Sequence, residues 1–126
     1  MKLPVEVRRV YDDHKGKKTE YRVLVDRLWP RGIAKEVLRL DEWAKDVAPS
    51  GDLRKWYGHD PERFEEFSRR YRKELRQSAP AGAVKEIVEA AAKRAVLVLL
   101  TATKDVEHSG ATVLADHLRS VMARRR

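Results

Sequence analysis

The first part of the chain has the residue pattern of β-strands. Apolar Val5, Val7 and Val10 are separated by charged residues, which predicts a short strand at the edge of a sheet. Residues 21–26, YRVLVD, are almost continuously apolar and predict a more deeply buried strand. The polar loop between them, which closes on Gly16, is too short for a helical crossover. The two strands therefore form either a hairpin or a pair joined by a bare loop crossing.

The middle of the chain is rich in aromatic residues. Leu40, Trp43 and Val47 have helical spacing, which predicts a short helix that ends at Pro49. Ser50 is then a suitable N-cap for a second helical turn. This turn would carry the apolar residues Leu53, Trp56 and Tyr57.

Two longer amphipathic helices are expected next. Asp60 followed by Pro61 is a start signal, an N-cap with proline at the first helical position. We expect the helix to stop before Pro80 and Gly82, and the pattern over 84–95 predicts another helix after them. The apolar stripe of the first helix consists of Phe64, Phe67, Tyr71 and Leu75.

The last part of the chain reads as a βα unit. Residues 95–101, AVLVLLT, form an apolar strand that must be buried on both faces, so helices should cover both sides of the sheet. A final helix with Ser109 as N-cap follows. These elements predict an α/β fold, a small three-layer Rossmann-like sandwich with a short, mainly parallel sheet and helices on both faces.

Length and charge narrow the picture. A chain of 126 residues has the size of one domain, so we expect a single domain over 1–126 with a frayed basic tail at 122–126. Lys and Arg number 28 against 20 Asp and Glu, a formal net charge of +8. This excess favours anionic partners, either a small molecule or nucleic acid, although interspersed charges are also typical of an ordinary charged surface.

Several classes of protein are excluded. Without cysteine there is no disulfide, thiolate nucleophile or Cys-ligated zinc. The N-terminus lacks a signal-peptide pattern and the longest apolar stretch, 95–100, is too short to cross a bilayer, so we expect a cytoplasmic protein. Metalloprotease, phosphate-loop, GxSxG and dinucleotide motifs are missing. Nothing in the sequence calls for a metal, and the cofactor stays open.

Polar segments follow the two strongest strands. Residues 26–32 follow the first and residues 101–109 follow the second. Ligands of open α/β sheets bind at the carboxyl ends of parallel strands, so the two segments share one crevice if the strands are parallel neighbours. The second segment also opens a helix, whose N-terminal amides favour an anion.

The candidate catalytic groups are Asp26, His108 and Asp105. A carboxylate that ends a buried strand is costly unless it is paired, and Arg27 or Arg31 could supply the partner. A histidine titrates near neutral pH, which suits acid/base chemistry in the last loop. A structural ion pair is the competing interpretation of Asp26.

The candidate anion-binding residues are cations, aromatic residues and the cap of the last helix. The aromatic members also have a structural interpretation, because aromatic rings near strand ends or at helical spacing usually pack in the core. The histidine before Asp60 could simply close a turn. The set is Arg27, Trp29, Arg31, Arg54, Trp56, His59, Lys104 and Ser109.

The chain closely resembles the YeaO-like branch of the domain-of-unknown-function 488 family. The resemblance lies in YRVLVDRLWPRG (21–32), LDEWAKDVAPS (40–50), LRKWYGHDPERFEEFSRRYRKEL (53–75) and LTATKDVEHSGATVLADHL (100–118). It implies an α/β fold with polar motifs that look like an active site, but no assigned activity. The corresponding positions are Asp26, Arg27, Pro30, Arg31, Arg54, Trp56, His59, Asp60, Lys104, Asp105 and His108.

The last loop departs from this family pattern. Similar short members tend to have two asparagines after the histidine, where this chain has Ser109 and Gly110, and longer relatives carry a Cys-His-Arg run. A thiol mechanism is therefore not available here, which leaves binding or acid/base chemistry.

Three functions remain open. The first is an enzyme acting on a phosphate-bearing or nucleotide-like substrate at the strand ends. The second is a nucleic-acid-binding module that uses Trp29, Arg54, Lys55 and Trp56. The third is a partner-binding domain whose polar motifs are structural.

Overall fold

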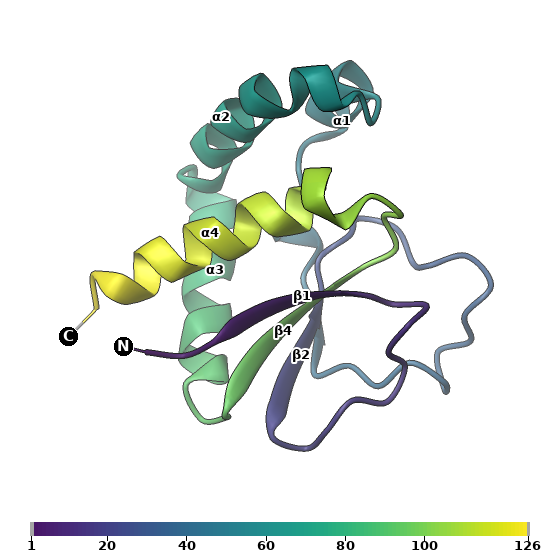
Figure 1. Cartoon of the computed structure of the whole chain (residues 1–126). Coiled ribbons are helices and arrows are strands. Elements are labelled where there is room, and N and C mark those ends of the chain that lie inside the picture. The colour runs from purple at the N-terminus through teal and green to yellow at the C-terminus, as the bar shows by residue number, and fades with distance from the viewer. Residues whose placement is uncertain (1, 126) are drawn as a thin grey trace.

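The computed structural model, which describes residues 2–125, is built on a parallel sheet (Figure 1). The strands of this described part lie in the order β1-β4-β2-β3, and each neighbouring pair is parallel. Their bounds are β1 (Val5–Arg9), β2 (Glu20–Leu24), β3 (Glu42–Trp43) and β4 (Val96–Thr101).

The central strand is β4, the most apolar one. It pairs with β1 on one side and β2 on the other, and its residues from Leu97 to Thr101 are buried. β1 lies at the edge, as its alternating pattern predicts. Because β4 lies between them, β1 and β2 cannot form a hairpin, and the loop from Val10 to Thr19 crosses over without a helix.

The helices follow from clear capping signals. The Ser50 hydroxyl accepts the Leu53 amide (3.2 Å), and the Ser109 hydroxyl accepts the Thr112 amide (3.3 Å), as predicted. The Asp60 carboxylate caps the short turn before α2. The bounds are α1 (Gly51–Tyr57), α2 (Phe64–Leu75), α3 (Ser78–Ala91) and α4 (Gly110–Ala123), with 3₁₀ turns η1 (Lys45–Val47), η2 (Pro61–Arg63) and η3 (Val106–His108). No helix in residues 2–125 is both long enough and apolar enough to span a membrane.

Two local expectations are wrong. The segment 40–47 is not an α-helix, because its first part adds to the open edge of β2: the Asp41 amide donates to Arg22 O and the Ala44 amide to Leu24 O, both at 2.9 Å. Only the 3₁₀ turn η1 in its last part is helical. α2 ends at Leu75, before Pro80 as expected, but α3 begins earlier than expected, at Ser78, so Pro80 lies in its first turn, where proline costs no helical hydrogen bond.

The chain end differs in detail from the expected tail at 122–126. α4 continues to Ala123, and Met122 is buried in the core. Residue 126 lies outside the described residues.

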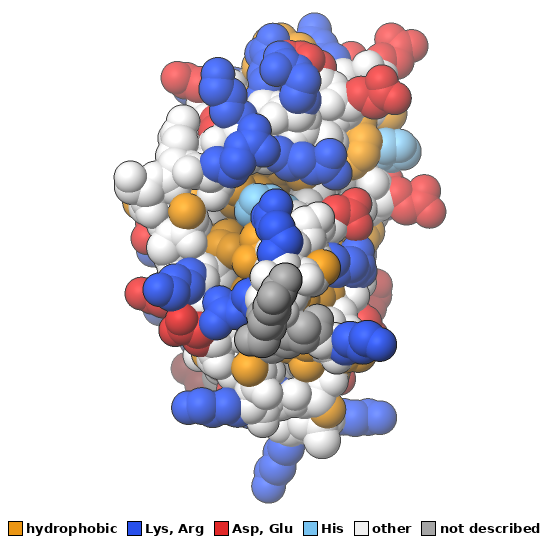
Figure 2. All heavy atoms as spheres, turned by 90° about the vertical axis from the view of Figure 1, so that its left-hand side faces the viewer, with side chains coloured by type: hydrophobic (Ala, Val, Ile, Leu, Met, Phe, Trp, Pro, Cys, Tyr) orange, Lys and Arg blue, Asp and Glu red, His pale blue; other side chains and the backbone are white. Residues whose placement is uncertain are grey.

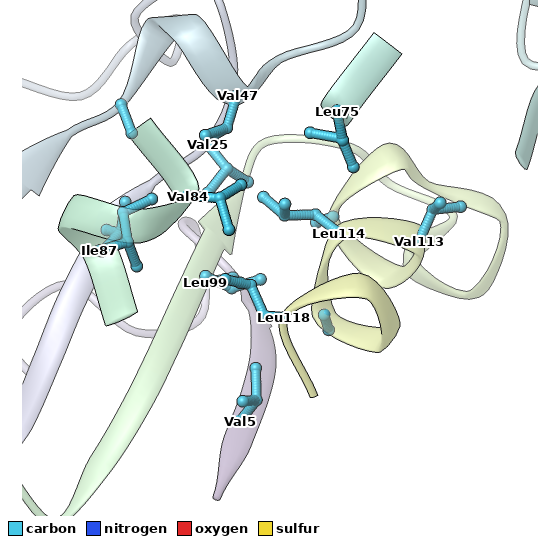
Figure 3. Packing of buried hydrophobic residues seen from close by; sticks show 14 of the residues in the cluster. Val5, Val25, Val47, Leu75, Val84, Ile87, Leu99, Val113, Leu114 and Leu118 are labelled. Carbon is cyan, nitrogen blue, oxygen red and sulfur yellow. The ribbon is translucent and has the colours of Figure 1, made fainter. Parts of the chain in front are cut away.

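The α-helices of the described chain belong to one buried cluster on one face of the sheet: α3 and α4 contact the strands, α2 packs on α3 and α4, and α1 packs on α2. Their apolar side chains meet inward-facing residues of the strands in one buried cluster (Figure 3). In α4, Leu114 and Leu118 are completely buried against this face. Residues labelled in the figure include Val5, Val25, Val47, Leu75, Val84, Ile87 and Leu99.

The other face is covered differently from our expectation. Its cluster contains Leu24, Val98 and Leu100 from the strands, with Ile33 and Leu38 from the segment between β2 and β3. Within residues 2–125, no α-helix contributes to this cluster. The fold is the expected α/β sandwich with a parallel sheet, but a largely irregular segment replaces the second helical layer.

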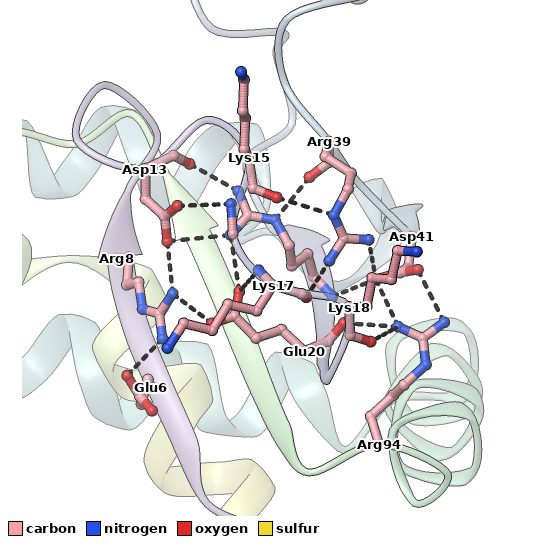
Figure 4. A network of polar contacts seen from close by, with 12 residues as sticks. Glu6, Arg8, Asp13, Lys15, Lys17, Lys18, Glu20, Arg39, Asp41 and Arg94 are labelled. Atoms are coloured by element: carbon pink, nitrogen blue, oxygen red, sulfur yellow. Dashed lines mark hydrogen bonds and ion pairs between the residues drawn. The ribbon is translucent and has the colours of Figure 1, made fainter.

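A buried ion network covers this second face beside the N-terminal half of β2 (Figure 4). The guanidinium group of Arg22 is fully buried and donates to Asp13 Oδ2 (3.1 Å), Glu20 Oε1 (3.2 Å) and two backbone carbonyls. Arg8 binds the same two carboxylates from β1. Gly16 has a positive φ of 58°, and a Cβ atom there would lie 2.2 Å from Arg22 Nη1, so only glycine fits.

Candidate functional site

A crevice opens at the carboxyl ends of β2 and β4. Its volume is about 470 Å³, and we call it the strand-end crevice. Most of its walls come from residues 25–31, 48–49, 54–59, 101–103 and 108–111. Both polar segments that follow the strong strands therefore contribute to one cavity.

Asp26 joins these two segments. Its Oδ1 accepts the Thr101 hydroxyl and its Oδ2 accepts the Ala102 amide, both at 2.7 Å. The expected ion pair with Arg27 or Arg31 does not form among the described residues, because neither guanidinium group lies within ion-pair distance of this carboxylate. Asp26 is thus held by neutral donors from β4.

The environment of Asp26 favours its protonated form. Burial raises the pKa of this carboxyl group above its usual value, and the opposing effects of the Ala102 amide, the Thr101 hydroxyl and the Arg54 charge do not restore it. Such a shift is common in binding and catalytic sites.

The shift predicts how stability depends on pH. The folded-state pKa of Asp26 lies above the unfolded-state value, so the folded protein binds more protons between the two values and loses stability as the pH rises through this window. Asp26→Asn should abolish that loss, because asparagine can accept from Ala102 and donate to Thr101. We expect a gain of about 1.4 kcal/mol for each pH unit between the two pKa values.

Urea denaturation of both proteins from pH 3.5 to 7 measures this difference. Asp46→Asn, a change at an exposed carboxylate, is the matched control. A constant difference between Asp26→Asn and wild type across this range would contradict the raised pKa.

Four cations line the crevice: Arg27, Arg31, Arg54 and Lys55. All four are exposed, and within residues 2–125 none has a carboxylate at ion-pair distance. Arg27 donates to the Pro49 carbonyl at 3.3 Å. The cavity therefore holds an excess of positive charge.

The N-terminus of α4 adds backbone donors. The Ser109 hydroxyl is not free for a ligand, because it accepts the Thr112 amide as the helix cap and donates to the Val106 carbonyl at 2.6 Å. Gly110 and Ala111 line the crevice, and their amides have no acceptor among the described residues. An anion here would meet these amides and the positive end of the helix dipole.

His108 lies in the crevice wall, but its sequence neighbours do not. Its Nδ1 lies 2.8 Å from Asp105 Oδ2, and its ring packs edge-on against Phe64. Tyr57, which the sequence argument did not single out as a site residue, donates its hydroxyl to the His108 carbonyl at 2.6 Å. Asp105 and Lys104 are not part of the lining, so Asp105 orients His108 from outside.

Of the two candidate tryptophans, only Trp29 reaches the crevice. Trp29 borders the crevice but packs against Trp43, and its indole N–H donates to the Ile33 carbonyl at 2.6 Å. Trp56 lies outside the crevice lining with Arg63 and Arg70 against its ring. These contacts support the structural interpretation of both tryptophans.

His59 is the unusual member of the lining. Its φ is 57°, a left-handed conformation that non-glycine residues adopt rarely, and it follows Gly58, which has φ 53°. Strained backbone of this kind gathers at functional sites. The two residues turn the chain from α1 toward η2 and bring the imidazole to the crevice.

Two further residues belong to the site, and only one of them, Thr101, could have been found from the sequence. Thr101 is the last residue of a strand that is otherwise apolar, and a polar side chain at the carboxyl end of a strand is well placed to line a binding site. Tyr57 belongs to an apolar stripe, which concealed its polar role. No group of three or more His, Asp or Glu side chains in the described range could hold a metal ion.

The comparisons with known proteins agree with the resemblance read from the motifs. The Uncharacterized protein Rv3073c of Mycobacterium tuberculosis (strain ATCC 25618 / H37Rv) is 47% identical over 114 residues, which cover 90% of this chain and 92% of the relative. The Uncharacterized protein YeaO of Escherichia coli (strain K12) is 42% identical over 119 residues, which cover 94% and 100%. No solved structure matches the chain.

A family model identifies the subclade. The model DUF488-N3i, described as "Inactive DUF488-N3 subclade", matches residues 4–126. The match includes every element of the crevice. The chain therefore belongs to the DUF488 family, within the subclade that this model describes.

Proposed function

We propose that the strand-end crevice binds a phosphate-bearing anion of nucleotide size and that the chain holds this ligand without converting it. The observation that carries the proposal is the convergence of four unpaired cations and an open helix N-terminus on one cavity. A volume of about 470 Å³ is typical of small-molecule sites. The description of the subclade as inactive supports binding without turnover.

The donors suit a phosphate group in particular. The amides of Gly110 and Ala111 would meet its oxygens at the N-terminus of α4, and Arg54 would balance its charge from α1. Among the described residues, Asp26 is the one carboxylate in the crevice lining. Both of its oxygens accept hydrogen bonds from residues at the end of β4, Thr101 and Ala102, and removing the charge in Asp26→Asn would lower the repulsion on the ligand.

Arg54→Gln tests the proposal. Loss of one charge-assisted hydrogen bond weakens the binding free energy by about 1.5–3 kcal/mol, so the affinity for AMP or ribose 5-phosphate should fall at least about tenfold. Asp26→Asn should bind equally well or more tightly. Isothermal titration with both compounds and with inorganic phosphate measures these changes.

Arg69→Gln is the matched control for Arg54→Gln. Arg69 lies on α2, pairs with Glu66 and takes no part in the crevice lining. Equal weakening by both changes would mean that only net charge matters. Wild-type protein that binds none of the three compounds would refute the proposal.

Catalysis is the second candidate, favoured by one arrangement. Asp26 has a raised pKa and shares the crevice with His108, which Asp105 orients. Incubation with AMP and ribose 5-phosphate, followed by ³¹P NMR and mass spectrometry, separates the two functions. A product formed by wild type and absent with Asp26→Asn would establish catalysis and overturn binding without turnover.

Binding of nucleic acid at this crevice is less well supported. Base stacking needs free aromatic faces, and Trp29 and Trp56 are engaged with other side chains.

A further inference from the structure

Arginine side chains gather on a second surface, away from the strand-end crevice. It is formed by the C-terminal halves of α2 and α4, and we define it as the α2–α4 basic face: Arg72, Arg76, His117 and Arg124. None of these residues lines the crevice. Figure 2 looks onto the side that holds the C-terminal end of α4, and its upper half carries a band of Lys and Arg side chains.

Helix geometry explains why these residues share one surface. Arg72 and Arg76, the C-cap residue of α2, are four residues apart, and His117 and Arg124, the C-cap residue of α4, are seven apart. Both C-cap residues keep a helical backbone, so each pair lies on one side of its helix. α2 and α4 pack together in the core. The positive charges of Arg124, Arg76 and Arg72 all act on the half-buried His117.

The cations of this face are not neutralised by the rest of the described chain. Arg72, Arg76 and Arg124 have no carboxylate within ion-pair distance among residues 2–125. Arginines nearby on the same helices behave differently: Arg69 pairs with Glu66, and Arg119 pairs with Asp116. The helix dipoles favour cations at both C-termini but supply only part of a counter-charge.

The pKa of His117 reflects the same excess of positive charge. Burial lowers the pKa of its imidazole, and the three neighbouring arginines lower it further. A bound anion would oppose the arginine contribution and raise this pKa. The histidine is therefore a natural probe of the surface.

We propose that the α2–α4 basic face binds the phosphate backbone of a nucleic acid. Guanidinium groups match phosphate oxygens in bidentate geometry better than ammonium groups do. Arg72 and Arg76 are separated by about 6 Å along the helix axis, and Arg124 lies on another helix. A polymer with repeated phosphates can contact all three arginines through successive phosphates.

The apolar surface argues against other partners. The exposed large hydrophobic side chains of the described chain are Tyr11, Leu28 and Val37, all outside α2 and α4. The basic face thus lacks the buried anchor that a protein interface needs and the apolar side chains that insert into a membrane. Contacts limited to phosphates would bind without sequence preference.

Fluorescence anisotropy with a labelled DNA duplex of about 20 base pairs tests the proposal. We expect a Kd of about 10⁻⁵ M or tighter at low salt, as for non-specific binding. The double variant Arg72→Gln, Arg76→Gln removes two phosphate contacts. It should weaken binding at least about tenfold and reduce the salt slope of log K by about 1.8.

The control is the double variant Lys35→Gln, Lys85→Gln, which has the same net charge and changes exposed residues outside α2 and α4. Circular dichroism checks that each variant is folded. NMR titration of His117 gives a second measurement, because its pKa should rise when wild type binds the duplex and should rise less, at the same concentrations, in the Arg72, Arg76 variant.

Several results would overturn the proposal. These are undetectable DNA binding at low salt, equal weakening by the control, or an unchanged His117 pKa in the complex. Binding to vesicles of anionic phospholipid without binding to DNA would assign the face to a membrane instead. Arg54→Gln should leave DNA binding intact, so this outcome is independent of the ligand in the crevice.

Discussion

Replacing Arg22 by methionine should destabilise the protein by about 3–5 kcal/mol. The guanidinium group is completely buried, and its removal leaves the carboxylate of Glu20, which is 3% exposed, and that of Asp13 without their inner partner. Arg8 remains, but it reaches them only from the β1 side. Urea denaturation at pH 7 measures the loss.

The same network also predicts how the stability of the protein changes with pH. Burial alone would raise the pKa values of Asp13 and Glu20, but the hydrogen bonds and charges of their partners, the two arginines included, hold both below their usual values. Their stabilising contribution is therefore present above the unfolded-state pKa values near 4 and is lost as the pH falls through the folded-state values. Arg22→Met should flatten this acid dependence.

A compensating variant makes the test specific. Glu20→Gln and Asp13→Asn added to Arg22→Met remove the uncompensated charges and should recover part of the lost stability. Arg69→Met, at an exposed pair, should change stability by less than about 0.5 kcal/mol. A loss below about 1 kcal/mol for Arg22→Met would show that the network is not a stabilising element.

Leu114→Ala should destabilise the protein by about 3–5 kcal/mol through the cavity it creates. Leu114 has no exposed surface and lies where α4 meets the helical cluster on the sheet (Figure 3). Helices surround this position, so the core cannot collapse easily to fill the space. Thermal unfolding and urea denaturation measure the effect.

Leu28→Ala is the matched control, because this leucine is 67% exposed. It should change stability by less than about 0.5 kcal/mol. A loss for Leu114→Ala no larger than that of Leu28→Ala would contradict the packing described for α4.

Local patterns in the sequence were enough to predict many of the helices and strands. Ser50, Asp60 and Ser109 are caps because a short polar side chain satisfies amides of its own helix, whatever the rest of the fold does. Likewise, a strand such as β4, with apolar residues in succession, has to be central.

The segment 40–47 shows where local reasoning ends. Leu40, Trp43 and Val47 have helical spacing, yet the backbone joins the edge of β2 as β3, because unpaired strand groups there need partners. Arg22 was equally hidden, since its place within an apolar strand gave no sign that four other polar groups would surround it.

The candidate site could likewise be predicted only in part from the sequence. Asp26 and the start of α4 were expected to share a crevice from their positions after two strands, and the structure brings them together. The separation of Asp105 from the lining and the packing of Trp29 against Trp43 depend on side-chain directions in an irregular loop. Spacing in the sequence carries no information about these directions.

The sequence by itself determined the caps, the apolar stripes, the central strand and the strand-end position of Asp26, since each depends on neighbours within a few residues. Only the tertiary structure decided that all described α-helices join one cluster on one face of the sheet, that Arg22 closes the other, and that four cations face one cavity. These features depend on the strand order β1-β4-β2-β3 and on pairs far apart in the chain, such as Asp26 and Thr101. Long-range contacts of this kind follow from which surfaces can be buried together, and no local pattern encodes that choice.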